Sequence, residues 1–124
     1  MARKITYWVS TGLVAAQAFI AAFIYLSGNP KAVHGFAHVG YPQQLRIILG
    51  VAKPLGAIAL LVPGMIRVKE WAYAGFAIAW ICAFFAHYLA GDGPFGPLLL
   101  LVLLVISYLT RPANRQFPVT VKQQ

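Results

Sequence analysis

Residues 5–27, ITYWVSTGLVAAQAFIAAFIYLS, carry no charged side chain over 23 consecutive positions. A helix that crosses the hydrocarbon core of a bilayer needs about 20 mostly apolar residues, so this run predicts a membrane-spanning helix. The composition agrees, because 60% of the 124 residues are hydrophobic and only 10% are charged. An average soluble domain is about a quarter charged, so the sequence excludes a soluble globular or disordered chain.

Three further apolar runs follow, at residues 44–62, 71–90 and 95–110. The second run contains one charge, Lys53, and the last is the shortest and is rich in leucine. Glycine and proline separate the runs, at Gly28-Asn29-Pro30, Gly40-Tyr41-Pro42, Pro63-Gly64 and Gly91-Asp92-Gly93-Pro94. The pattern predicts an all-α protein in which residues 1–124 form one domain, an integral membrane antiparallel four-helix bundle with short connections. Only the connection at 28–43 is long enough to carry structure of its own.

The charges are one-sided, with ten basic residues, two acidic residues and a formal net charge of +8. In a four-span bundle, seven of the basic residues lie on one side: Arg3, Lys4, Arg67, Lys69, Arg111, Arg115 and Lys122. Lys31 and Arg46 lie on the other side. Because basic residues accumulate in cytoplasmic segments, we expect both termini to be cytoplasmic. The positive charge therefore indicates topology and contact with the lipid bilayer, and no nucleic acid partner is expected.

Lys53 is the charge that topology does not explain. A lysine inside a span costs roughly 2.5–3.5 kcal/mol on insertion scales, and Lys53 lies about 13–15 Å below the outer end of its helix at 1.5 Å per residue. Pro54 removes a backbone donor and frees the carbonyl of Gly50. Gly50, Lys53 and Ala57 share one face, which can pack closely against another helix.

Other polar side chains are expected near Lys53. Arg46 lies on almost the same stripe of the helix, and Gln17 of the first span lies at a similar depth. His87 is close to the outer end of the third span, and Asp92 follows in the outer turn. Side chains lean towards the N-terminus of their helix, so Lys53 and His87 on antiparallel helices lean towards each other.

This arrangement predicts an outward-facing polar pocket with His87, Lys53 and Asp92 as acid-base candidates. Its ligand-binding candidates are Arg46, Gln17, Lys53 and His87. A structural polar network that fixes the helix register, with Lys53 reaching outer headgroups, is the alternative interpretation.

Several other residues give weaker indications. His34 and His38 have the i, i+4 spacing of a metal-binding pair, but no third ligand follows nearby, so we expect a solvated loop and no metal site. The carboxylate of Glu70, in the first turn of the third helix, interacts favourably with the helix dipole and can neutralise Arg67 or Lys69. Cys82 is a lone cysteine, which excludes a disulfide within the chain.

The stretch LGVAKPLGAIALLVPGMIRVKEWAYAGFAIAWICAFFAHYLAGDGP at 49–94, followed by SYLTRP at 107–112, resembles the DoxX-like family of small four-helix membrane proteins. The likeness begins near Tyr41 and covers most of the remaining chain. The matching positions are Lys53, Glu70, Trp71, His87, Asp92, Ser107, Tyr108 and Arg111. The resemblance implies a protein of the bacterial cytoplasmic (inner) membrane. The family is functionally diverse and includes a subunit of a quinone-linked oxidoreductase, so the resemblance does not assign a catalytic residue.

Three functions remain open from the sequence. A quinone-linked or redox-associated membrane subunit would hold a quinone head group or small anion between Lys53 and His87, and a membrane redox partner would supply the redox centre. A non-enzymatic scaffold or assembly factor, including a homo-oligomer, would use its small-residue helix faces. A small membrane enzyme acting on a lipophilic substrate would use His87 and Asp92 as proton donor and acceptor.

Overall fold

The computed structural model describes residues 2–116, in which all regular secondary structure is helical. The prediction of an all-α fold is therefore confirmed. The elements are α1 (Ala2–Leu26), α2 (Pro30–His38), α3 (Gln43–Leu61), α4 (Ile66–Leu89), α5 (Phe95–Leu109) and a short 3-10 helix, η1 (Ala113–Arg115).

The helix α2 occupies the connection that separates the first two apolar runs. It begins where the Asn29 side chain accepts a hydrogen bond from the backbone N–H of Lys31 at 2.9 Å, and Pro30 at its first position needs no backbone partner. Gly28 makes the turn before it with φ +72°, a conformation that glycine adopts without strain. The sequence predicts a connection with structure of its own here, but it does not predict a helix.

The helix α4 starts several residues earlier than the predicted span at 71–90. Its first residue is Ile66, so Arg67 and Lys69 lie in its first turn and not in a loop. No helix-breaking residue stands between Met65 and Trp71, and the helix therefore extends back to the Pro63-Gly64 turn.

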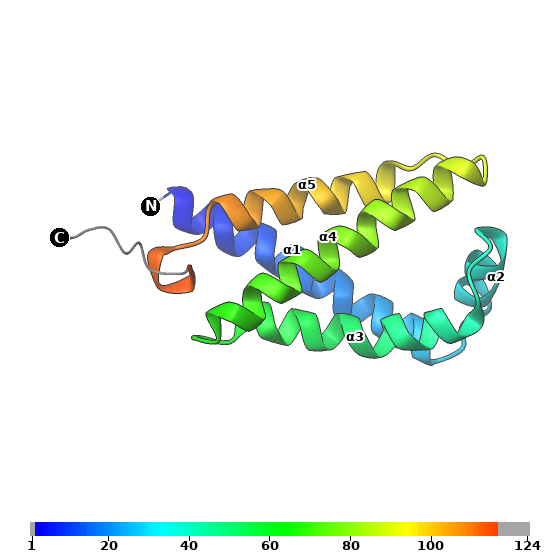
Figure 1. The fold of residues 1–124 in the computed structure, drawn as a ribbon, viewed down its shortest axis with the longest axis horizontal. Helices are drawn as coiled ribbons and strands as arrows, with labels where there is room; N and C mark the ends of the chain where they lie inside the picture. Colours follow the sequence, from blue (N-terminus) through cyan, green and yellow to red (C-terminus); the bar gives the residue numbers. More distant parts are fainter. Residues whose placement is uncertain (1, 117–124) are drawn as a thin grey trace.

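Four helices, α1, α3, α4 and α5, run in alternating directions (Figure 1). The helix α1 packs against α3 and α5, and α4 packs against α3 and α5. The helices α1 and α3 pack closely at Gly50, where an added Cβ would lie 2.8 Å from the side chain of Leu26. Both α1 and α5 have an end beside η1, whereas α2 lies at the opposite end of the molecule (Figure 1).

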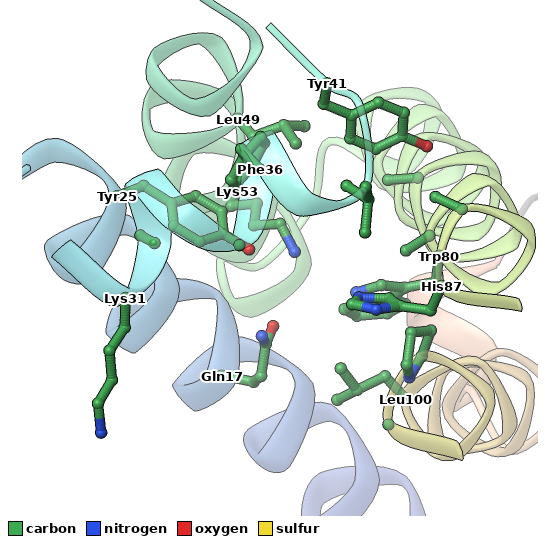
Figure 2. Close-up of a pocket in the computed structure, with 18 residues that line it drawn as sticks. Gln17, Tyr25, Lys31, Phe36, Tyr41, Leu49, Lys53, Trp80, His87 and Leu100 are labelled. Atoms are coloured by element: carbon green, nitrogen blue, oxygen red, sulfur yellow. The ribbon is translucent and has the colours of Figure 1, made fainter. Parts of the chain in front are cut away.

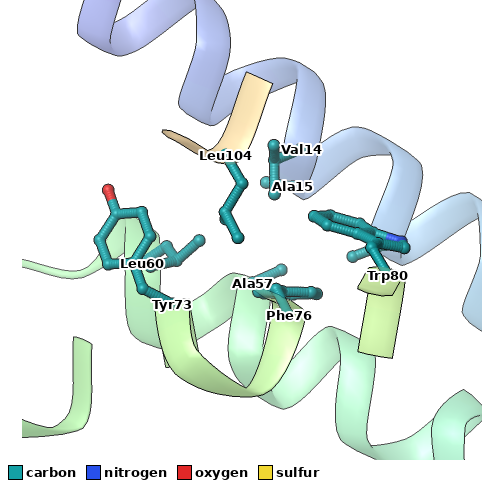
Figure 3. Close-up of a cluster of buried hydrophobic side chains, with 9 residues drawn as sticks. Val14, Ala15, Ala57, Leu60, Tyr73, Phe76, Trp80 and Leu104 are labelled. Atoms are coloured by element: carbon teal, nitrogen blue, oxygen red, sulfur yellow. The ribbon is translucent and has the colours of Figure 1, made fainter. Parts of the chain in front are cut away.

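The buried centre is a small cluster to which all four of these helices contribute (Figure 3). Its members are Val14, Ala15, Ala18, Ala57, Leu60, Tyr73, Phe76, Trp80 and Leu104. Many large apolar side chains, such as Phe23, Leu55 and Leu89, are exposed, whereas Lys53 and Lys69 are buried. Exposed apolar surface of this extent indicates contact with lipid.

Three of the helices, α1, α3 and α4, are long and apolar enough to cross a membrane. The shorter helix α5 is apolar along its whole length. By length and composition these are the helices of an integral membrane protein.

Candidate functional site

A cavity of about 370 Å³ lies near the α2 end of the molecule and is lined by residues of all five α-helices (Figure 2). The helix α2 contributes Phe36, α3 contributes Lys53, and α4 contributes Trp80 and His87. This volume lies in the range of pockets that hold small organic ligands. Most of the lining is apolar or aromatic, with a few polar side chains between.

Lys53 places a buried ammonium group in this cavity. The residue is only 7% exposed, and its Nζ lies 5.2 Å from the centre of the Trp80 ring and 6.0 Å from that of Tyr25. The chain has only two acids, and neither forms an ion pair with Lys53. Aromatic faces compensate part of the cost of burying this cation, but no carboxylate within residues 2–116 neutralises it.

Gln17 and His87 face the same cavity from α1 and α4 (Figure 2). The Oε1 atom of Gln17 is buried and has no hydrogen-bond partner within residues 2–116, which is unusual for a buried amide. The Nδ1 atom of His87 lies 3.1 Å from Asp92 Oδ2, so Nε2 is the ring nitrogen left for a ligand. Both of these side chains, like Lys53, are among the expected site residues.

Asp92 does not line the cavity and lies in the turn after α4. Its carboxylate contacts His87 and also the Nε2 atom of His38, at 3.0 Å. Hydrogen bonds from His87 and then His38 lower the pKa of Asp92 below its ordinary value. The carboxylate therefore joins α2 to the end of α4 beside the cavity, and it orients the imidazole of His87.

The role of His38 was not predicted from the sequence. His34 and His38 were expected in a solvated loop, whereas both lie in the helix α2, and His38 contacts Asp92, 54 residues away in the sequence. Between residues 2 and 116, no group of three or more His, Cys, Asp or Glu side chains is placed to hold a metal ion. Only the folding of α2 onto the end of α4 reveals the contact.

Arg46 differs from its expected position, because it does not line the cavity. Its Nε donates to Gln43 Oε1 at 2.9 Å, and its NH1 donates to the backbone carbonyl of Tyr25. Tyr25 is in the last turn of α1, where carbonyls lack helical partners and the helix dipole favours a cation. Arg46 therefore fastens α3 to the end of α1.

Glu70 also has a different partner from the expected Arg67 or Lys69. It forms an ion pair with Arg111 at 2.7 Å and accepts a hydrogen bond from Tyr108 at 2.9 Å. The Arg111 guanidinium lies 3.6 Å from the centre of the Tyr108 ring. These contacts join the start of α4 to the end of α5, a tertiary pairing that sequence proximity cannot predict.

Two buried cations at the η1 end have no carboxylate partner within residues 2–116. Lys69 donates to the carbonyls of Ala59 and Val62. Arg115 donates to the carbonyls of Leu60 at 2.7 Å and Leu61 at 3.0 Å. Both cations therefore satisfy carbonyls around the end of α3, a role that was not predicted from the sequence.

Ser107 lies at the centre of a buried group of hydroxyls. Its Oγ is 2.5 Å from Thr11 Oγ1 and 2.7 Å from the Tyr73 hydroxyl. These three side chains connect α1, α4 and α5. They lie outside the cavity, and their hydrogen bonds fix the mutual register of the three helices.

The family model described as the DoxX-like family matches residues 9–110. The resemblance found in the sequence is therefore confirmed over most of the chain. No curated protein and no solved structure matches the chain significantly.

Proposed function

Because the chain belongs to the DoxX-like family, we propose that it is a four-span protein of the bacterial cytoplasmic membrane whose cavity binds the head group of a quinone. In this proposal it serves as a membrane subunit of a redox system, and a partner protein supplies the electrons. The observation that carries the proposal is the buried, unpaired ammonium of Lys53 in an aromatic cavity.

The chemistry of the cavity suits a quinone. The Lys53 ammonium is a hydrogen-bond donor for a quinone oxygen, and aromatic rings such as that of Trp80 favour contact with a planar ring. The unpartnered Oε1 of Gln17 can accept a hydrogen bond from the hydroxyl of the reduced quinol. His87 can give or take a proton at Nε2 because Asp92 fixes its other nitrogen.

The tryptophans allow a direct test of binding. Trp80 lines the cavity, whereas Trp8 lies outside it. We expect a variant with Trp80 as its only tryptophan to show saturable fluorescence quenching by a short-chain benzoquinone. A variant that keeps only Trp8 is the control, because it reports quenching by quinone dissolved in the detergent. Its quenching should rise with quinone concentration without saturating. Equal, unsaturable quenching in both variants would rule out the quinone site.

The proposed topology places α1, α3, α4 and α5 across the membrane with both termini in the cytoplasm. Alternating helix directions and the basic residues near the η1 end support it. At 1.5 Å per residue, the 15-residue helix α5 is about 22 Å long, which requires local thinning of the bilayer or flanking residues that reach the interface.

Cysteine labelling tests this orientation. In a Cys82→Ser background, we expect an impermeant maleimide to label Lys31→Cys in intact cells and Lys4→Cys only after permeabilisation. The two sites are matched, since each replaces an exposed lysine near a helix start. The reverse pattern would overturn the assigned orientation.

A further inference from the structure

A second cavity of about 340 Å³ lies in the groove between α3 and α4. Small residues make up much of its lining, including Ala52, Gly56, Ala72 and Gly75. An added Cβ at Gly75 would meet no atom within 4 Å, so its lack of a side chain leaves open space in the groove. Small residues on adjacent helices often allow close packing, but here they border a cavity.

The groove adjoins the cavity of the candidate site. Leu49, Lys53 and Ala79 line both spaces. Lys53 is more than nine-tenths buried, and neither acid of the chain pairs with it. Its ammonium points into the first cavity (Figure 2), while its stem forms part of the wall between the two spaces. A cavity with several polar side chains and an apolar groove therefore meet at Lys53.

The groove opens towards the surrounding lipid. Leu55 and Trp71 line it and are 62% and 67% exposed. From Lys53 it extends along α3 as far as Ala59, about 9 Å at the helical rise of 1.5 Å per residue. The first cavity lies on the α2 side of Lys53 and has α2 residues in its wall. The groove therefore lies beside that cavity and reaches the exposed outer surface of the bundle.

We propose that the α3–α4 groove holds the hydrocarbon chain of an amphiphilic ligand whose polar head lies at Lys53. The inference rests on the proposed head-group site and adds the ligand class, a quinone or related lipid with an alkyl or isoprenoid tail. The head lies towards α2 and the tail towards the η1 end. This orientation suits a ligand that enters from the leaflet nearer α2, with its tail directed into the bilayer interior.

Two benzoquinones, one without a side chain and one with a decyl chain, test the inference. Binding is measured from Trp80 fluorescence in a Trp8→Phe, Trp71→Phe protein, which keeps an aromatic ring at position 71 of the groove wall. Gly75→Leu fills the groove without reaching the head-group cavity, because Gly75 lines only the groove. We expect it to weaken binding of the decyl compound about tenfold or more, since two apolar groups cannot occupy one space. Affinity for the compound without a tail should stay within about twofold.

Gly12→Leu is the matched control. Gly12 is also an exposed helical glycine with no atom within 4 Å of an added Cβ, and it lies outside both cavities. This variant should leave both affinities unchanged. The tail assignment is overturned if Gly75→Leu weakens both compounds equally, weakens neither, or instead dissociates a dimer whose second copy fills the groove. Failure of both compounds to bind the parent protein would refute the head-group site itself.

Discussion

Replacement of Lys53 by methionine separates a ligand-binding role from a structural one. Methionine keeps an unbranched side chain and removes the charge. The lysine is 7% exposed and lacks an acidic partner, and its charge costs roughly 2.5–3.5 kcal/mol inside a span. Contacts with Trp80 and Tyr25 return about 0.5–2 kcal/mol. The difference predicts that Lys53→Met raises the free energy of unfolding by about 0.5–3 kcal/mol.

The same substitution should weaken ligand binding. A hydrogen bond to a charged group contributes about 1.5–3 kcal/mol, which corresponds to roughly 10- to 150-fold in affinity. Thermal unfolding in detergent without ligand measures the first effect, and quinone titration monitored at Trp80 measures the second. Lys53→Arg serves as the control, because it retains the charge and should retain part of the affinity.

A lower melting temperature together with unchanged quinone affinity in Lys53→Met would refute this reasoning. That outcome would show that the ammonium stabilises helix packing through its aromatic neighbours. The structural polar network considered from the sequence would then be the correct interpretation of Lys53.

Three further predictions concern contacts outside the cavity. Contacts with His87 and His38 lower the pKa of Asp92 in the folded protein below its ordinary value of 3.8. These contacts therefore stabilise the fold above pH 3.8, and the stabilisation is lost as the pH falls through the lowered pKa. Melting temperatures of wild type and Asp92→Asn should therefore converge in acid, and a constant difference down to pH 3 would contradict this. Ser107→Ala leaves two buried hydroxyls without their shared partner and should cost about 1–3 kcal/mol by thermal unfolding; a loss below about 0.5 kcal/mol would indicate that the hydroxyls re-pair. Arg111→Met removes the partner of a partly buried carboxylate and should cost about 1–3 kcal/mol. In the Glu70→Gln background the same change should cost clearly less, and equal costs in both backgrounds would show that the two residues are not coupled.

The sequence was most informative where a regular helix determines the position of a side chain. Helical spacing and the lean of side chains predicted that Lys53 and His87 approach one another, and both line one cavity. Gln17 was expected near Lys53 only because the two residues lie at similar depths in their spans, and it also faces this cavity. Lys53 and Gln17 lie in the interior of long helices, where the rise per residue gives a reliable position, and His87 lies in the last turn of a regular helix.

Residues near helix ends were harder to place. Arg46 is on the expected stripe, but its long side chain reaches the nearby end of α1 and not the cavity. Lys69 was assigned to a loop because the start of α4 was predicted too late. The partners of Glu70 and His38 lie 41 and 54 residues away. Pairings of this kind depend on how the ends of different helices meet, which a single sequence does not record.

The cations at the ends of α1 and α3 have a consequence for acid resistance. Backbone carbonyls, unlike carboxylates, do not take up protons in mild acid, so the contacts of Arg46, Lys69 and Arg115 keep their strength as the pH falls. The Asp92 carboxylate attaches α2 to the end of α4, and its contacts with the two histidines are lost once acid protonates it. Acid should therefore loosen the molecule from α2 first, while α3 stays fastened to α1 and α4. Amide hydrogen exchange at decreasing pH would show this order directly.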